Sequence, residues 1–163
     1  MILENFTQDD ISEFLSWVQG CTPEFLCQFA GPRYHHPLDQ TQLQATLEDD
    51  SVVMLKLMDS GQMLAHAQIM RISSSQNTAS LGRILVHPQF QGQGHSTRLM
   101  HLLKEYLLHH YEITNITLQV YDFNHNAIKS YRKNGFVEIR RTHQPIPQLN
   151  STWISIEMQY SGE

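Results

Sequence analysis

A predicted strand that leads through two closely spaced glycines into a long helix constrains the fold of this chain more than any other feature. The run ASLGRILV (79–86) is typical of a strand, and Pro88 ends it because proline cannot donate to a β ladder. Over residues 96–111 the apolar side chains recur with a period of about 3.6, which predicts an amphipathic helix. Gly92 and Gly94 lie between the two, so the free N–H groups of a helix N-terminus follow a glycine turn.

The other predicted elements give a mixed α/β pattern. Helices are expected at 8–18, 23–30, 37–50 and 124–134, and strands at 1–6, 51–59, 63–73, 116–122, 136–143 and 152–160. Short turns separate the central strands, which predicts antiparallel pairing in the first half, whereas the two later strand–helix–strand units need crossover connections. Residues 144–150 (QPIPQLN) are expected to form a loop. We therefore expect one domain over residues 1–163, with a mixed sheet of about six to seven strands flanked by helices.

Composition and charge exclude several classes of protein. The formal net charge of -5 argues against a general nucleic-acid binder, which needs a clustered basic face. No apolar run approaches the roughly 20 residues of a membrane span, and the N-terminus lacks the basic and apolar regions of a signal peptide. We therefore expect a cytoplasmic protein with no membrane and no nucleic-acid partner.

Neither the cysteines nor the histidines form a pattern typical of a metal site. Cys21 and Cys27 are too few for a disulfide scaffold or a closed zinc site, so we interpret them as reduced thiols. The ten histidines include the adjacent pairs 35–36 and 109–110, and neighbours on a helix point to different faces. No H-E-x-x-H motif occurs, so no bound metal is expected.

The glycine turn is a candidate phosphate site, although turns with two glycines are also common as purely structural elements. A P-loop needs a lysine directly after its glycines, and none follows here. A dinucleotide-binding turn needs a third glycine where this chain has Thr97, and Asp122 lies later than the acidic residue of that motif. Nucleotide and dinucleotide ligands are therefore disfavoured.

The segment RILVHPQFQGQGHSTRLM (83–100) resembles the acetyl-CoA signature of the GNAT superfamily of N-acetyltransferases. In that signature a strand ends in V-x-P, the pattern Q/R-x-x-G-x-G/A follows, and a long helix begins. Gln91, Gly94 and Ser96 occupy the three defining positions. Ser96 departs from the usual Gly or Ala but is still small, and His95 replaces a common aliphatic residue.

A second segment, LQVYDFNHNAIKSYRKNGFVEI (118–139), resembles a later block of the same superfamily. There a strand leads to N-x-x-A, then to a tyrosine and to G-F, which Asn124, Ala127, Tyr131 and 135–136 match. Two blocks in the right order are more specific than either alone. The resemblance covers most of the chain and implies a GNAT-like mixed sheet.

The resemblance implies roles for particular residues. Acetyl-CoA would be the cosubstrate, and an amine would attack its thioester directly. The backbone of Ile84 and Val86 would hold the pantetheine arm, and Asn124 would either contact that arm or only cap its helix. The amides of Gln91, Gly92, Gln93, Gly94, His95 and Ser96 would hold the pyrophosphate. Tyr131 would protonate the leaving thiolate, because a phenol with a pKa of about 10 keeps its proton at neutral pH.

The general base and the acceptor pocket are less defined. The strand 79–86 carries no carboxylate, so His66 or a water chain could serve as the base; a satisfied strand histidine is the favoured interpretation of His66, and the base stays unassigned. The segment 23–38 offers Phe25, Phe29, Arg33 and Tyr34 for an acceptor pocket, in which Arg33 could meet a carboxylate. Core packing with a solvated arginine is the alternative, and 144–150 is a second candidate lid.

The function that this pattern favours is transfer of an acetyl group from acetyl-CoA to a primary amine of a small molecule. One alternative is acetylation of a protein N-terminus or lysine, and another is a non-catalytic acyl-CoA-binding module. Exposed sheet edges also make a homodimer an expectation.

Overall fold

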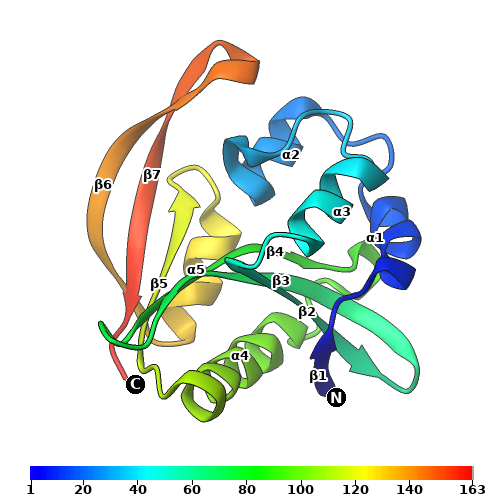
Figure 1. Ribbon diagram of the computed structural model, residues 1–163. Helices are drawn as coiled ribbons and strands as arrows, with labels where there is room; N and C mark the ends of the chain where they lie inside the picture. The colour runs from blue at the N-terminus through cyan, green and yellow to red at the C-terminus, as the bar shows by residue number, and fades with distance from the viewer. Residues whose placement is uncertain (163) are drawn as a thin grey trace.

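Seven strands form one mixed sheet in the computed structural model of the protein, which describes residues 1–162 (Figure 1). Their order is β1-β2-β3-β4-β5-β7-β6, and of the adjacent pairs only β4 and β5 run parallel. The strands are β1 (Ile2–Asn5), β2 (Val52–Asp59), β3 (Gln62–Ser73), β4 (Thr78–Val86), β5 (Asn115–Tyr121), β6 (Phe136–Ile146) and β7 (Ser151–Tyr160). The strand number and the antiparallel first half confirm the expected fold class.

Helices cover both faces of the sheet, and each face has its own apolar core. One face carries α1 (Ile11–Trp17), α2 (Pro23–Ala30) and α3 (Gln40–Leu47), and the other carries α4 (His95–Tyr111) and α5 (His125–Lys133). Four short 3₁₀ turns complete the chain: η1 (Gln8–Asp10), η2 (Gly31–Arg33), η3 (Pro88–Phe90) and η4 (Pro147–Leu149). Within residues 1–162, no helix has the length and apolar character needed to span a membrane.

Local sequence signals explain where the first helices begin. The side chains of Thr22 and Asp39 each accept a hydrogen bond from the backbone N–H three residues later, at 3.1 and 3.0 Å. Asp10 completes a capping box with Thr7, whose N–H donates to Asp10 Oδ2 at 2.7 Å. The predicted helices 8–18 and 37–50 are shorter in the structure, because a 3₁₀ turn precedes α1 and the Asp39 cap starts α3.

The expectation that residues 144–150 form a loop was wrong for its first half. Strand β6 continues to Ile146, and Pro145 is tolerated because β6 is an edge strand with one unpaired side. Ile146 is fully buried against Cys27 and Tyr121, which holds the strand end to the sheet and to α2. Only the 3₁₀ turn η4 then separates β6 from β7.

The sheet opens between β4 and β5. These strands pair over only four positions, from Thr78 opposite Asn115 to Leu81 opposite Leu118. Beyond Leu81, a bulge at Arg83 shifts the register of β4 against β3. The extra residue reverses the alternation of side chains, so Leu81 joins the core under α4 whereas Leu85 joins the core under α1–α3. The second half of β4 therefore has an edge without a strand partner.

Candidate functional site

Strand β4 presents backbone groups to the open edge. The N–H of His87 donates to Leu64 O of β3 at 2.8 Å, so the backbone groups of Val86 face the opposite side. The side-chain amide of Gln91 confirms this direction, since its Nε2 donates to Val86 O at 3.2 Å. Ile84 lies two residues earlier and presents its backbone to the same edge. The structure thus brings Ile84 and Val86 to the gap beside β5.

The glycine turn follows directly and exposes free backbone donors. Gly92 and Gly94 have φ angles of 76° and 84°, a left-handed conformation that glycine adopts without steric cost. No heavy atom lies within 4 Å of the position that a Cβ would take at either glycine. Within residues 1–162, the backbone N–H groups from Gln91 to Ser96 have no backbone acceptor, and the first N–H of α4 to find one is that of Arg98. An open helix N-terminus of this kind suits an anionic ligand such as a phosphate.

Ser96 and His95 connect this turn to its surroundings. Ser96 Oγ lies 3.3 Å from Ser130 Oγ, so the small residue at this position joins the start of α4 to α5. His95 packs edge-on against Phe90, and its buried Nδ1 has no hydrogen-bond partner in the described chain. The side chain at position 95 therefore points into the protein, and its backbone N–H remains available to a ligand.

Tyr131 lies on α5, and Asn124 is the residue that caps the start of this helix. The Tyr131 ring packs edge-on against Phe136 at 6.3 Å, and burial raises the pKa of its phenol to about 12. The phenol therefore carries its proton at neutral pH. Asn124 Oδ1 accepts from the N–H of Ala127 at 3.4 Å, so its side chain caps α5 in this structure.

His66 has a structural position rather than one inside a ligand cavity. It is fully buried against the rings of Phe6 and Phe14, with centroids 5.1 and 4.5 Å away. Burial lowers the pKa of His66 to about 4, and its Nδ1 hydrogen-bonds to the carbonyl of Arg83 at 3.0 Å. The neutral imidazole thus fixes the β4 bulge through Nδ1, while its buried Nε2 has no hydrogen-bond partner within residues 1–162. Its packing against two phenyl rings fits a core histidine better than a general base.

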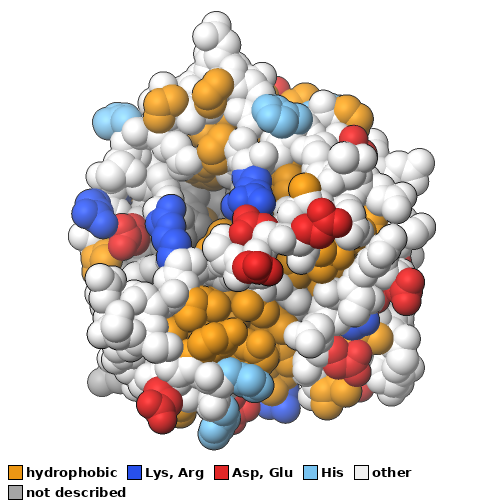
Figure 2. All heavy atoms as spheres, in the orientation of Figure 1, with side chains coloured by type: hydrophobic (Ala, Val, Ile, Leu, Met, Phe, Trp, Pro, Cys, Tyr) orange, Lys and Arg blue, Asp and Glu red, His pale blue; other side chains and the backbone are white. Residues whose placement is uncertain are grey.

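A cavity of about 390 Å³ opens on the α2 side of the same gap, and we call it the α2-side cavity. Figure 2 views the molecule from this side and shows the hollow with basic side chains at its rim. Its floor is the polar face of the sheet, formed by Ser80, Thr117, Gln119, Ser155 and Glu157. The wall comes from α2 and η2. The sheet therefore separates this cavity from the glycine turn, and the gap between β4 and β5 is where the two sides approach each other.

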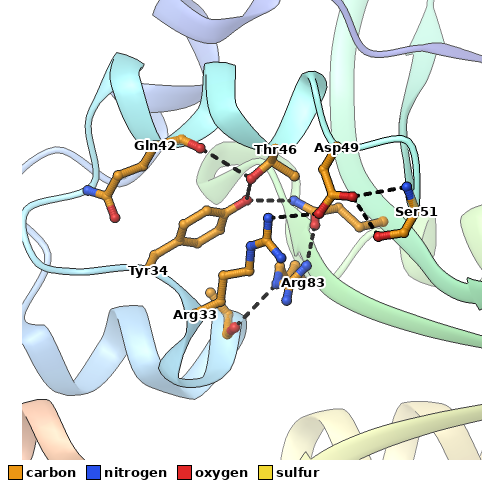
Figure 3. A network of polar contacts seen from close by, with 9 residues as sticks. Arg33, Tyr34, Gln42, Thr46, Asp49, Ser51 and Arg83 are labelled. Carbon is orange, nitrogen blue, oxygen red and sulfur yellow. Dashed lines mark hydrogen bonds and ion pairs between the residues drawn. The ribbon is translucent and has the colours of Figure 1, made fainter.

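The sequence predicted the lining of this cavity only in part. Phe29 and Arg33 line it as expected, and Gln144 does so from the candidate lid. Phe25 lies on the outer surface instead, and Tyr34 is buried in a polar network beneath the cavity. Arg33 is also engaged already, because its Nη2 lies 3.2 Å from Asp49 Oδ2 (Figure 3).

Three charged residues of the cavity were not predicted from the sequence: Arg71, Arg83 and Glu157. The alternation of β7 could have identified Glu157, because it lies two residues after Ser155 and shares its face. Glu157 is held by Arg140, whose Nη2 and Nε lie 2.6 and 3.2 Å from its Oε2. No sequence pattern identified Arg71 and Arg83, because a β-bulge at a residue other than glycine has no local sequence signature.

A polar network fixes Arg83 below the cavity (Figure 3). Arg83 Nη1 donates to Gln68 Oε1 at 2.6 Å, and Gln68 Nε2 donates to Tyr34 Oη at 3.1 Å. Tyr34 Oη lies 2.8 Å from Thr46 Oγ1, which ties the network to α3. Gln68 and Thr46 are fully buried, and these contacts satisfy them.

Comparisons with known proteins agree with this geometry. The sequence model of the Acetyltransferase (GNAT) family matches residues 12–136. The fold resembles spermidine N-acetyltransferase from Vibrio cholerae, solved with CoA and spermine, at a TM-score of 0.81 and 15% identity over 97% of this chain and 93% of that one. It also resembles AAC(6')-Ib with paromomycin and acetyl-CoA (TM-score 0.74, 19% identity, 98% and 92% covered). A third match is the ribosomal-protein-S18-alanine N-acetyltransferase of Escherichia coli (TM-score 0.70, 21% identity, 97% and 91% covered).

Proposed function

The chain belongs to the GNAT family of acetyltransferases, and from this premise we propose that it transfers an acetyl group from acetyl-CoA to a primary amine of a small molecule. One observation carries the proposal. The glycine turn with its free N–H groups directly follows the open edge of β4, and α5 supplies a protonated phenol at Tyr131. The α2-side cavity reaches the gap between β4 and β5 from the opposite face.

The residues beside the gap fit a bound acetyl-CoA. The exposed turn leaves room at Gly92 and Gly94 for a phosphate to approach the backbone, and the N–H groups up to Ser96 would donate to it. The backbone of Ile84 and Val86 would pair with the amides of the pantetheine arm, as a strand partner would. The side-chain amide of Gln91 donates to Val86 O in this structure, and it would have to turn away to leave this carbonyl free for the pantetheine arm. When bound, acetyl-CoA supplies the activated acetyl group.

The proposed reaction forms one N–C bond and breaks one C–S bond. The neutral amine attacks the carbonyl carbon of the thioester, and the C–S bond electrons leave with the sulfur. Tyr131 Oη donates its proton to that thiolate and regains one when product leaves. The surplus proton of the amine passes to water.

The size of the α2-side cavity favours a small acceptor. Ligand pockets for small molecules typically enclose about 300–1,000 Å³, and this cavity of about 390 Å³ lies at the lower end. Its polar floor of hydroxyl and amide groups suits an acceptor that forms several hydrogen bonds. Protein acceptors would need an open groove across this side of the molecule.

The first test is calorimetric titration of the purified protein with acetyl-CoA, with NADH and ATP as controls. We expect selective binding of acetyl-CoA. A screen of primary amines that follows thiol release then tests transfer. Absence of acetyl-CoA binding by the folded protein would contradict the proposal, and binding without transfer to any amine would favour a non-catalytic acyl-CoA module.

The role of Tyr131 has its own test. We expect Tyr131→Phe to lower kcat by roughly 100-fold or more, the usual contribution of a positioned acid, with little change in acetyl-CoA affinity. Tyr160→Phe is the matched control, because Tyr160 packs on the same Phe136 ring at 5.7 Å. Equal turnover of the two variants would remove Tyr131 from the chemistry.

A further inference from the structure

The α2-side cavity carries an excess of positive charge in a chain whose net charge is -5. The charged residues of its lining are Arg33, Arg71, Arg83 and Glu157. Arg33 pairs with Asp49, and Glu157 pairs with Arg140. In the part of the chain that the structure describes, neither Arg71 nor Arg83 forms an ion pair. Two arginines therefore line the cavity without an acidic partner.

Arg83 is held rigidly, yet only by neutral groups. Its Nη1 donates to Gln68, its Nε donates to Ala30 O at 3.4 Å, and its guanidinium lies 5.6 Å from the centre of the Tyr34 ring (Figure 3). Burial lowers the pKa of the Arg83 guanidinium, and the nearby positive charges of Arg33 and Arg71 lower it further. Burying a charge without a counter-ion costs free energy. Because Nη2 has no hydrogen-bond acceptor within residues 1–162, it is available to a ligand anion.

Arg71 and Arg83 share an unusual backbone conformation. Their φ angles are 53° and 49°, in the left-handed region that costs a non-glycine residue roughly 1–2 kcal/mol. Both lie at register shifts between the neighbouring strands β3 and β4. Bulges of this kind redirect a side chain, and strained residues cluster at functional sites. Two independent irregularities thus bring two arginines to one cavity wall.

We propose that Arg71 and Arg83 bind a carboxylate of the acceptor, so that the substrates are amines that carry a carboxylate near the amino group. This inference rests on the proposed function, whose acceptor site it specifies. A carboxylate has two acceptor oxygens: the free Nη2 of Arg83 would donate to one of them, and Arg71, whose side chain makes no hydrogen bond within residues 1–162, would donate to the other. Polyamines would instead place positive charge against Arg71 and Arg83, and among the described lining residues Glu157, whose Oε2 is bound by Arg140, is the one acidic side chain.

The carboxylate could belong to a free amino acid or to an acidic residue at the N-terminus of a peptide. Both present an amine and a carboxylate to the same arginines. The small volume of the α2-side cavity, about 390 Å³, favours the free amino acid, and a panel of acceptors that contains both kinds separates the two sources.

A binding experiment tests the inference without requiring turnover. The product-like pair N-acetylglycine and N-acetylglycinamide differs only in the carboxylate, and each would be titrated into the CoA-loaded protein and followed by amide chemical shifts. We expect at least tenfold tighter binding of N-acetylglycine. Arg71→Gln should remove this preference and leave the fold intact, because the Arg71 side chain makes no hydrogen bond within residues 1–162. Equal binding of the pair by the wild-type protein would overturn the inference.

Two further variants sharpen that result. Arg83→Lys keeps the charge and loses the Nη2 donor, so it should weaken N-acetylglycine binding but not N-acetylglycinamide binding. Arg141→Gln is the matched control, since Arg141 pairs with Glu138 on β6 and does not line the cavity. An equal loss in Arg141→Gln and Arg71→Gln would show a general charge effect and contradict a site at Arg71.

A turnover experiment separates the inference from the proposed function. Acetyl transfer would be measured with free amino acids, the matching amino acid amides, spermidine, and a peptide that begins with glutamate. We expect kcat/KM for amino acids to exceed that for their amides by at least tenfold, and Arg71→Gln to abolish that ratio. Spermidine as the best acceptor would refute the inference and leave the proposed function intact. Absence of transfer to every amine would refute the proposed function, while the product-binding pair would still decide the carboxylate site.

Discussion

Replacing His66 should remove a specific part of the protein's pH-dependent stability. In the folded protein burial lowers the pKa of His66 to about 4, whereas an unfolded histidine titrates near 6.5. Between these values the unfolded state binds a proton that the folded state rejects, so acid favours unfolding. The stability contribution is therefore complete above pH 6.5 and is lost as the pH falls toward 4.

The magnitude follows from the two pKa values of His66. A tenfold difference in proton affinity between the folded and unfolded states corresponds to about 1.4 kcal/mol. The difference between a pKa of 6.5 and one of about 4 therefore gives ~3–4 kcal/mol of unfolding free energy. Between pH 7 and pH 4.5, where both states are partly titrated, roughly 2 kcal/mol of this amount is lost. A domain with a typical stability of ~5–15 kcal/mol would show this loss clearly.

The variant His66→Asn tests this reasoning. Its amide can still donate to Arg83 O from the position of Nδ1, but it does not titrate. Urea unfolding at pH 7 and pH 4.5 should show a free-energy difference roughly 2 kcal/mol smaller in the variant than in the wild-type protein. His143→Asn, at an exposed position of β6, is the control and should retain the wild-type difference. The same pH dependence in His66→Asn and wild type would refute the assignment.

Three other substitutions probe the turn, a cap and the core. Gly94→Ala should lower the free energy of unfolding by ~1 kcal/mol, because alanine is strained at a φ of 84°, and should weaken acetyl-CoA binding at least tenfold by calorimetry; unchanged affinity would place the phosphate elsewhere. Asp39→Ala should cost ~1 kcal/mol in urea unfolding through loss of the α3 cap, with acetyl-CoA binding unaffected. Leu103→Ala removes a fully buried side chain of α4 and should cost ~2–5 kcal/mol, and a smaller loss would show that the core repacks.

Local sequence patterns predicted the parts of the fold that depend on local physics. The apolar period over 96–111 predicts α4 because four buried residues recur on one face of that helix. The Asp39 cap and the alternation of β7 likewise gave the right elements. Both GNAT-like blocks were recognised because glycines and caps have fixed spacing along the chain.

The features that sequence reasoning missed depend on contacts between distant segments. Residues 144–146 extend β6 because Ile146 is buried against Cys27 and Tyr121, which no local pattern reveals. The bulge at Arg83 depends on His66, seventeen positions earlier in the chain. The positive charge of Arg71 and Arg83 in the α2-side cavity could therefore be found only from the three-dimensional arrangement of β3 and β4.

The sheet separates two sides of the molecule, and the missing pairing of β4 with β5 beyond Leu81 and Leu118 leaves an opening through it, which we call the window. Acetyl-CoA at the glycine turn and the acceptor amine in the α2-side cavity would enter from opposite sides of the sheet and meet only in the window. Both must then be bound at once, so we expect sequential kinetics with no exchange of label between acetyl-CoA and free CoA. An acyl group longer than acetyl would project through the window into the acceptor's space. The width of the β4–β5 gap would then limit acyl-chain length, and long-chain acyl-CoA should compete with the amine as well as with acetyl-CoA.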